Sequence, residues 1–365
     1  MRAAKYLVIL FLLGNLAANT PLPVHADIPL AGRAQATDLW GDLIPGTDTT
    51  FAVYRQTFRY GMEPFLITDI RPDDRYADKE AYEMHTLTIY RAHDGQAFLQ
   101  HQPVIFYVHG GGWTDGYAAW YAFVANSFTG EKGWVTVIID YRLTSDQVFI
   151  ADEYCPDRVI CEQPANVVQR TKAAWYPDNI ADVAKAYDWV VANIAHYGGD
   201  PNAIFVFGHS AGGHLASLLA THPAHALQRG SITGVVSMSG AYLLTEMQQT
   251  FWGSAISQTF EEGFEDTQAL LDASPATYVT ATMALPPFYL LYAEDDLLNL
   301  TQQSLVFYSK LEQYGLPVEI SYLPGYGHVS EMEAIGSIDE TPTQLIIAWI
   351  AKLLRKRTYV PLIIR

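Results

Sequence analysis

The sequence of 365 residues contains only two cysteines and few basic residues. Lysine and arginine total 22 against 39 aspartates and glutamates, so the formal net charge is −17 at pH 7. This acidity argues against nucleic acid or an anionic membrane surface as a partner. The chain also lacks internal repeats, low-complexity tracts and linkers rich in glycine, serine or proline. These absences favour one large domain with a full core.

The N-terminal apolar run is too short to span a bilayer. The run covers residues 6–13, and two basic residues precede it. A polar stretch follows and ends in Val-His-Ala at residues 24–26. This order, with small residues around the cleavage point, is typical of a secretory signal peptide; an uncleaved anchor is the alternative. We therefore expect residues 1–26 to be removed, no stable membrane span afterwards, and export to the periplasm or the medium.

The cysteines, Cys155 and Cys161, lie close together in the sequence. In an exported protein this spacing favours a disulfide that closes a short surface loop. A metal pair or a nucleophilic thiol is the alternative, but neither has His or Cys partners at a suitable spacing nearby. We predict the disulfide, which stabilises so small a loop by about 2 kcal/mol on chain-entropy grounds.

Strand and helix patterns alternate along most of the chain. Apolar runs predict strands at 84–90, 103–108, 134–139, 204–207, 235–240, 287–293 and 318–323. The strand at 84–90 is expected at a sheet edge, and the strand at 103–108 is expected to be covered on both faces. Helical patterns occur at 118–128, 177–196, 301–314 and 343–355. This alternation predicts an α/β fold with a mostly parallel sheet and helices on both faces.

Residues 27–365 are expected to form a single domain with three additions. These are an N-terminal arm (27–83) and two cap or insert regions (143–174 and 241–286). The arm is expected to be irregular over 27–61 and to carry a charged, exposed insertion at 71–83. The insert at 143–174 begins where a strand ends, which is where open α/β sheets bind ligands. The second region contains three aromatic residues: Phe251, Trp252 and Phe260. They belong either to a small, partly apolar helical cap or to the hydrophobic core.

A strand, a tight turn and a helix meet in the segment 204–221, which reads IFVFGHSAGGHLASLLAT. Ser210 lies at the apex of its G-x-S-x-G motif, with glycines two positions away on either side. Those glycines let strand and helix approach closely, and the helix start directs N–H groups and partial positive charge towards the serine. Taken alone, the motif could also mark an ordinary turn serine.

The chain also offers a base and an acid in the order expected for such a serine. A serine hydroxyl needs a base that removes its proton, and the base needs a third group to orient it. In elbow-type enzymes the acid comes first and the histidine last, each after a strand. His328 follows the last strand and is the only histidine after residue 225. Asp296 is the preferred acid, ahead of Asp295 and then Glu294.

A second glycine motif, His109-Gly110-Gly111-Gly112-Trp113, follows a buried strand. Glycines there free backbone N–H groups to face a ligand. No G-K-[ST] follows and the dinucleotide pattern is absent, so we expect no cofactor and no metal. We expect an oxyanion site from the N–H groups of Ala211, Gly111 and Gly112, with Gly110 as a further candidate. Three more side chains are interpreted as supporting residues: His109, His209 and His214, with Trp113 packed beneath the loop.

These motifs together resemble the α/β-hydrolase fold. The resemblance rests on HGGGW (109–113), DYRL (140–143), the segment 176–216, DASPATYV (272–279), and the DDLL and GYGH loops. Within that fold they are similar to carboxylesterases related to hormone-sensitive lipase and to kynurenine formamidase-like enzymes. The resemblance implies a triad of Ser210, Asp296 and His328, and oxyanion donors at Gly111, Gly112 and Ala211. The acid loop lacks the proline often found after the aspartate, so Asp295 stays an alternative.

The expected function is that of an exported serine hydrolase that cleaves small or medium esters through an acyl-enzyme. An arylformamidase-like amidase or an exported serine peptidase would use the same side chains. A binding module that has lost catalysis on a hydrolase scaffold is the alternative from another class, and the intact set of motifs argues against it. The acyl group, the alcohol group and the oligomeric state are not encoded in these patterns.

Overall fold

The computed structural model describes residues 42–43, 49–60, 64–70, 80–82, 85–144, 147–149, 167–170, 174–251, 263–297 and 299–358. The expected signal peptide and both cysteines lie outside the described residues, as do Trp252 and Phe260. Export and the disulfide therefore stay predictions. Among the helices in the described ranges, none has both the length and the apolar character that crossing a membrane requires.

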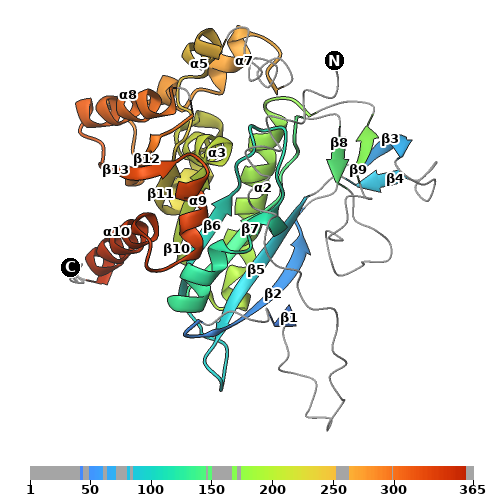
Figure 1. The fold of residues 1–365 in the computed structure, drawn as a ribbon, viewed down its shortest axis with the longest axis vertical. Helices are drawn as coiled ribbons and strands as arrows, with labels where there is room; N and C mark the ends of the chain where they lie inside the picture. Colours follow the sequence, from blue (N-terminus) through green and yellow to red (C-terminus); the bar gives the residue numbers. More distant parts are fainter. Residues whose placement is uncertain are drawn as a thin grey trace, which may run out of the picture.

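A nine-stranded sheet forms the centre of the molecule (Figure 1), in the order β1-β2-β5-β7-β6-β10-β11-β12-β13. Its strands are β1 (Asp42–Leu43), β2 (Ala52–Arg59), β5 (Thr86–His93), β6 (Gln102–Val108), β7 (Val135–Ile139), β10 (Gly199–His209), β11 (Ile232–Met238), β12 (Phe288–Asp295) and β13 (Val318–Gly327). From β7 to β13 all neighbours pair in parallel, whereas β1, β2 and β5 join antiparallel. The mostly parallel sheet confirms the expected fold class.

Helices cover both faces of this sheet. One face carries α2 (Asp178–Asn193), α3 (Ala211–Thr221) and α8 (Leu300–Gln313), and the other carries η3 (Ala118–Tyr121), η4 (Asn126–Glu131), α9 (Ser330–Glu333) and α10 (Thr341–Thr358). The remaining helical elements are η6 (Ile194–Tyr197), η7 (Pro223–His225), α4 (Ala226–Ser231), α5 (Leu244–Phe251), α7 (Thr267–Asp272), η8 (Pro275–Tyr278) and η9 (Ala334–Gly336). Helices on both faces require central strands that are apolar on both sides.

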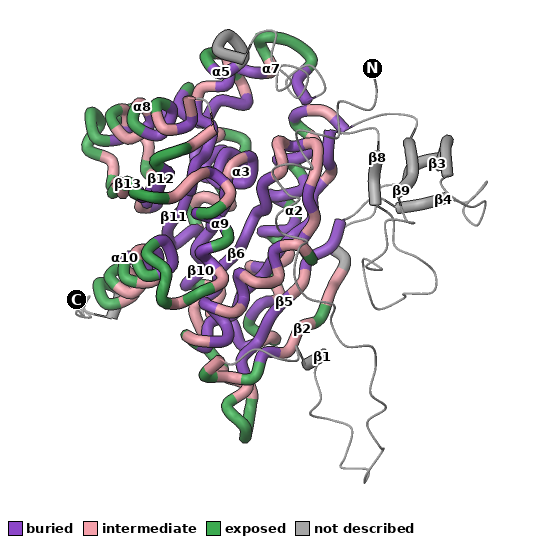
Figure 2. Tube along the Cα trace, viewed as in Figure 1, coloured by how far each residue is buried: buried purple, intermediate pink, exposed green. Residues whose placement is uncertain are grey.

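Strand β6 illustrates how the sequence produces these two cores. Side chains alternate along a strand, so Val104, Phe106 and Val108 join the core under α2 and α3. Ile105 and Tyr107 point the other way, into the core under α10. All five are fully buried, which confirms the expected covered strand. Figure 2 shows the central strands buried, with exposed residues on the outer helices.

Two expectations about the N-terminal half are wrong. The segment 84–90 was expected at a sheet edge, but β5 lies between β2 and β7. It is covered because Ala52–Arg59, inside the arm expected to be irregular, forms β2 and pairs with it from Ala52 to Arg59. The alternating pattern of β5 is therefore not an exposed face, and most of its residues are buried.

Three further elements differ from the sequence patterns. Segment 118–128 was expected to form one helix, but it contains η3 and the start of a π-helical turn, η4. The last strand continues beyond the expected end and runs to Gly327. The arm and the first insert contribute a second sheet, in the order β4-β3-β9-β8, from Pro64–Ile70 (β3), Glu80–Tyr82 (β4), Gln147–Phe149 (β8) and Val167–Arg170 (β9).

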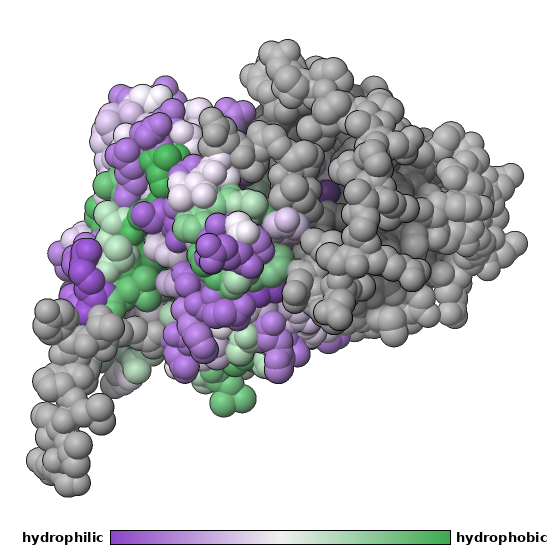
Figure 3. All heavy atoms as spheres, turned by 90° about the horizontal axis from the view of Figure 1, so that it is seen from below, coloured by the Kyte–Doolittle hydropathy of each residue, from purple (hydrophilic) through white to green (hydrophobic). Residues whose placement is uncertain are grey.

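The second sheet lies beside the main body, on the side away from α8 and α10 (Figure 1). It joins two segments that are far apart in the sequence, because β3 pairs antiparallel with β9. On the face drawn in Figure 3, hydrophilic and hydrophobic residues are interspersed over the described part of the chain. The parallel strands β6, β10, β11, β12 and β13 all end at one edge of the main sheet, and the loops that follow them build the site described below.

Candidate active site

Ser210 sits on a strained turn between β10 and α3. Its backbone has φ +57° and ψ −122°, a conformation that residues with a side chain adopt rarely and at a cost of about 1–3 kcal/mol. The flanking glycines permit the turn: a Cβ on Gly208 would lie only 2.7 Å from the backbone nitrogen of Gly213. A Cβ on Gly212 would lie 2.6 Å from the carbonyl oxygen of His109. The turn therefore presents the hydroxyl beyond the end of the strand.

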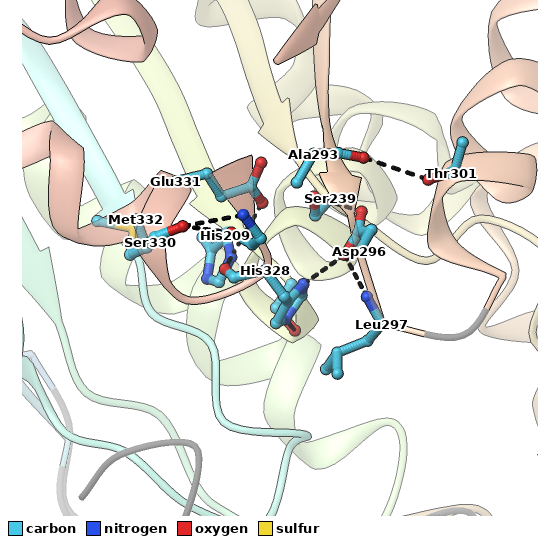
Figure 4. Close-up of polar contacts among 12 residues, drawn as sticks. His209, Ser239, Ala293, Asp296, Leu297, Thr301, His328, Ser330, Glu331 and Met332 are labelled. Atoms are coloured by element: carbon cyan, nitrogen blue, oxygen red, sulfur yellow. Dashed lines mark hydrogen bonds and ion pairs between the residues drawn. The ribbon is translucent and has the colours of Figure 1, made fainter. Parts of the chain in front are cut away.

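The structure brings Ser210, His328 and Asp296 together from three separate loops. The Nε2 atom of His328 lies 3.0 Å from the hydroxyl oxygen of Ser210. Its Nδ1 atom lies 2.7 Å from Oδ1 of Asp296, and Figure 4 shows the imidazole beside that carboxylate. His328 is 7% exposed and the Asp296 side chain is 1% exposed. A hydroxyl, an imidazole and a buried carboxylate thus form one continuous line of hydrogen bonds.

Asp296 is selected over its two acidic neighbours by where each side chain points. Its Oδ1 accepts a hydrogen bond from the backbone N–H of Leu297, and its Oδ2 accepts one from the hydroxyl of Ser239 (2.7 Å each). Asp295 is exposed and offers His328 only its backbone carbonyl. Glu294, also exposed, accepts from the N–H of Gly325. The structure therefore places Asp296, and neither neighbour's carboxylate, against the imidazole.

The glycine loop after β6 lies directly against the serine. A Cβ on Gly110 would come within 3.2 Å of the Ser210 Cβ, a tight contact that a glycine avoids. Gly111 and Gly112 follow with φ of +118° and +60°. Their backbone N–H groups have no acceptor among the described residues. Free N–H donors next to the hydroxyl are what a developing negative charge on a substrate oxygen requires.

His109 holds the start of this loop. Its Nδ1 donates to the carbonyl oxygen of Gly110 at 2.7 Å, and its ring stacks on Tyr121 and Tyr141. Burial lowers its pKa from 6.5 to about 4, so the ring is neutral at neutral pH. The structure thus places His109 as a support of the glycine loop and not in the line of the three side chains.

Comparisons with known proteins agree with this fold. The BD-FAE family profile matches residues 166–311. The structure of esterase B from Lactobacillus rhamnosus superposes with a TM-score of 0.61 at 18% identity, over 84% of this chain and 87% of that one. An esterase from Pyrobaculum calidifontis gives a TM-score of 0.55 at 21% identity, over 82% and 87%. The chain has the α/β-hydrolase fold.

Curated relatives of this α/β-hydrolase are ester hydrolases by name. The probable carboxylic ester hydrolase LipM of Mycobacterium tuberculosis is 31% identical over 258 residues, which cover 67% of this chain and 53% of LipM. The isoprenylcysteine alpha-carbonyl methylesterase ICME of Arabidopsis thaliana is 26% identical over 62% of this chain and 51% of ICME. The chain spans about half the length of these relatives. They bear out the expected resemblance to carboxylesterases.

Two further buried side chains lie next to His328. His209 precedes the serine, and its Nε2 donates to the backbone carbonyl of His328 at 2.9 Å. The same Nε2 lies 3.3 Å from a carboxyl oxygen of Glu331, and Figure 4 draws the Glu331 side chain near His209. Burial lowers the pKa of His209 well below 6.5, with the neighbouring His328 as a second cause. This contact links the turn that carries Ser210 to the loop that carries His328.

Glu331 is a site neighbour that the sequence patterns did not single out. It is fully buried, and neither carboxyl oxygen has a hydrogen-bond partner among the described residues. Burial, together with the charge of Asp296, raises its pKa well above 4.5, which favours a neutral carboxylic acid. Its position three residues after His328 was the only sequence signal, since a helical turn there directs the side chain back towards the base.

Within the described ranges, one group of side chains has metal-ligating chemistry: His209, His328 and Glu331, with donor atoms within 4.8 Å of one another. The histidine nitrogens of this group are already engaged. Both nitrogens of His328 face Ser210 and Asp296, and Nε2 of His209 donates to a carbonyl. An ion here would have to displace those hydrogen bonds, so this group fits the proton chemistry of a serine nucleophile better than metal binding.

Proposed function

We propose that the protein is an exported serine hydrolase that cleaves carboxylic esters through an acyl-enzyme. The unbroken hydrogen-bond line from Ser210 through His328 to Asp296, at 3.0 and 2.7 Å, carries this proposal. The ester hydrolases among its relatives support the substrate class. The N-terminal signal-like segment supports export.

In the first half of the reaction, the hydroxyl oxygen of Ser210 attacks the ester carbonyl carbon. Nε2 of His328 takes the hydroxyl proton, and Asp296 stabilises the imidazolium that forms. The carbonyl oxygen becomes an oxyanion and accepts hydrogen bonds from the N–H groups of Gly111, Gly112 and Ala211, each of which contributes about 3 kcal/mol to transition-state stability. The C–O bond then breaks, and the leaving alkoxide takes its proton from His328.

In the second half, water repeats these steps on the acyl-enzyme. His328 takes a proton from the water as its oxygen attacks the acyl carbon. The same N–H groups hold the second oxyanion, and the bond to Ser210 breaks as His328 returns the proton to the serine oxygen. The products are the carboxylic acid and the free enzyme, with no net change in charge on the protein.

The Ser210→Ala variant tests this proposal. We expect kcat on p-nitrophenyl acetate to fall by about 10⁴- to 10⁶-fold, because the variant keeps the binding groups but lacks the nucleophile. A fluorophosphonate probe should label the wild type and leave Ser210→Ala unlabelled. Ser217→Ala is the matched control, since Ser217 lies on the same helix and bonds only the carbonyl of Gly213. A wild-type rate in Ser210→Ala would refute the mechanism.

A further inference from the structure

Three consecutive residues of the glycine loop have a positive φ. Gly111, Gly112 and Trp113 have φ values of +118°, +60° and +62°. Glycines adopt this region freely, but a tryptophan there is strained. Such a residue keeps this conformation only where its surroundings fix it. The surroundings of Trp113 therefore determine the shape of the loop that presents the N–H groups of Gly111 and Gly112.

One buried hydrogen bond fixes the indole. Nε1–H of Trp113 donates to Nδ1 of His214 at 3.0 Å, and the two rings meet edge to face with centroids 5.2 Å apart. Phe264 packs edge to face on the indole at 5.5 Å. Trp113 is 4% exposed and His214 is fully buried, so water does not replace this bond. The backbone carbonyl of Trp113 accepts from the N–H of Thr144 at 2.8 Å.

The role of His214 as acceptor depends on its tautomer. Its Nε2–H donates to the backbone carbonyl of Ala273 at 2.6 Å, which leaves Nδ1 unprotonated and able to accept from the indole. Burial lowers the pKa of His214 from 6.5 to about 4, so the ring is neutral at neutral pH. A positively charged ring would carry a proton on Nδ1 and lose the bond to Trp113.

His214 also belongs to the helix that starts at the nucleophile. Its backbone N–H donates to the carbonyl of Ser210 at 3.0 Å. The bond between Trp113 and His214 therefore joins the loop of the oxyanion donors to the first turn of α3. A change in this one contact would alter the distance between the donors and the serine oxygen.

We propose that Trp113 and His214 are positioning residues whose hydrogen bond sets the N–H groups of Gly111 and Gly112 relative to Ser210. The inference rests on the proposed function and extends it, because neither side chain is part of the hydrogen-bond line to Asp296. A positioning role of this kind acts on the oxyanion, which exists in the transition state and not in the bound ester. Loss of the bond should therefore lower kcat and leave KM almost unchanged.

The Trp113→Phe variant removes the N–H and keeps an aromatic ring. We expect kcat on p-nitrophenyl acetate to fall by about 10- to 100-fold, less than the loss of a whole oxyanion donor, with KM within about two-fold of wild type. The inhibition constant of a trifluoromethyl ketone, which forms an oxyanion on the serine, should rise by the same factor as kcat/KM falls. A purely structural role of Trp113 would leave both kcat/KM and the inhibition constant at their wild-type values.

Trp349→Phe is the matched control. Trp349 is also 4% exposed and packs in the core on the opposite face of the sheet, and its Nε1 donates to the half-exposed carboxylate of Glu319 at 3.1 Å. Both variants lose one indole N–H bond of similar length, and Trp113→Phe should lose more thermal stability, because it leaves Nδ1 of the buried His214 without a donor. Only Trp113→Phe should lose kcat. Equal kcat values in the two variants, with the wild type active, would overturn the inference and leave the proposed function standing.

A second variant covers the case in which Trp113→Phe does not fold. The amide oxygen of Asn can replace Nδ1 of His214, whereas Leu at that position removes the acceptor. We expect His214→Asn to keep at least about five-fold more kcat than His214→Leu, since hydrogen bonds of this kind contribute about 1 kcal/mol. Equal kcat in both would overturn the inference. An inactive wild type that fluorophosphonate does not label would instead refute the proposed function, and the inference with it.

Discussion

In the part of the chain that the structure describes, two buried pairs of histidine and aspartate have almost the same spacing. His328 lies 2.7 Å from Asp296 at the edge where the parallel strands end. His85 lies 2.8 Å from Asp182, where β5 faces helix α2. The aspartate side chains are 1% and 2% exposed. Neither distance nor burial distinguishes the two pairs, so the chemistry must come from what surrounds each of them.

The two pairs differ in the third group that each one contacts. Nε2 of His328 faces the hydroxyl of Ser210. The second carboxylate oxygen of Asp182 accepts instead from the side chain and the backbone N–H of Arg142, at 2.8 and 3.0 Å. Burial opposes ionisation of Asp182, yet the hydrogen bonds from His85 and Arg142 hold its pKa below the ordinary value. One pair ends at the hydroxyl of Ser210, and the other ends at a permanent cation, Arg142 of the DYRL motif.

The largest expected effect breaks the first pair. Asp296→Asn should lower kcat by about 10⁴-fold, because the amide favours the wrong tautomer of His328 and cannot balance the imidazolium charge. Folding should be almost unchanged, as seen in the thermal midpoint. Asp295→Asn is the control, and its kcat should stay within about two-fold because that side chain is exposed. If only Asp295→Asn lost activity, the acid would be misassigned.

Breaking the second pair should affect stability and not catalysis. Asp182→Asn leaves Arg142 without its buried carboxylate, so the free energy of unfolding in urea should fall by about 3–5 kcal/mol. Activity per fluorophosphonate-labelled site should stay within about two-fold. Asp178→Asn is the control: Asp178 lies 3.3 Å from the same guanidinium, but its side chain is 42% exposed, and we expect a loss below about 1 kcal/mol. A large fall in activity per labelled site would mean that the pair of His85 and Asp182 also supports catalysis.

A smaller and graded effect comes from the buried neutral histidines around the site. Burial lowers the pKa of His109 and His214 to about 4 each, and that of His209 well below 6.5. A histidine with a lowered folded-state pKa contributes stability above pH 6.5, and that stability is lost as the pH falls towards 4.

His109 and His214 each add up to about 1.4 kcal/mol per pH unit to the slope of unfolding free energy between pH 6.5 and 4. Buried acids with raised pKa values, Glu331 among them, contribute a slope of the opposite sign, so the test is the difference between two variants. Urea unfolding of His214→Asn should show a slope smaller than that of the wild type by one proton. Equal slopes would contradict the neutral state of the His214 ring, and with it the acceptor role of His214.

Sequence patterns predicted the parts of the molecule whose signals are local. The elbow around Ser210 and the glycine loop at 109–113 are each encoded within a few residues, and the acid and the base each follow a strand pattern directly. Asp296 and Asp295 are neighbours, and which carboxylate meets His328 depends on the pairing of β12 with β13. Patterns favoured Asp296, but only the fold shows the direction of each side chain.

The parts that could not be predicted depend on distant pairing. Strand β2 looked irregular, because its sequence AVYRQTFR does not alternate cleanly and becomes a strand through its partner β5. The pairing of β3 with β9 joins an arm and an insert that have no common motif. Glu331 was missed because an isolated acidic residue on a short helix resembles a solvated one until the packing around it is known.

Strand β13 has a further consequence for how the catalytic groups assemble. It remains paired with β12 up to Gly327, opposite Asp295, so the residues just before the base and the acid are cross-strand neighbours. His328 and Asp296 therefore each follow a strand end that backbone hydrogen bonds hold in place. The entropy of bringing imidazole and carboxylate together is lost when the chain folds and not when an ester arrives. Turnover should begin without a lag, since the first ester molecule meets a geometry that is already complete.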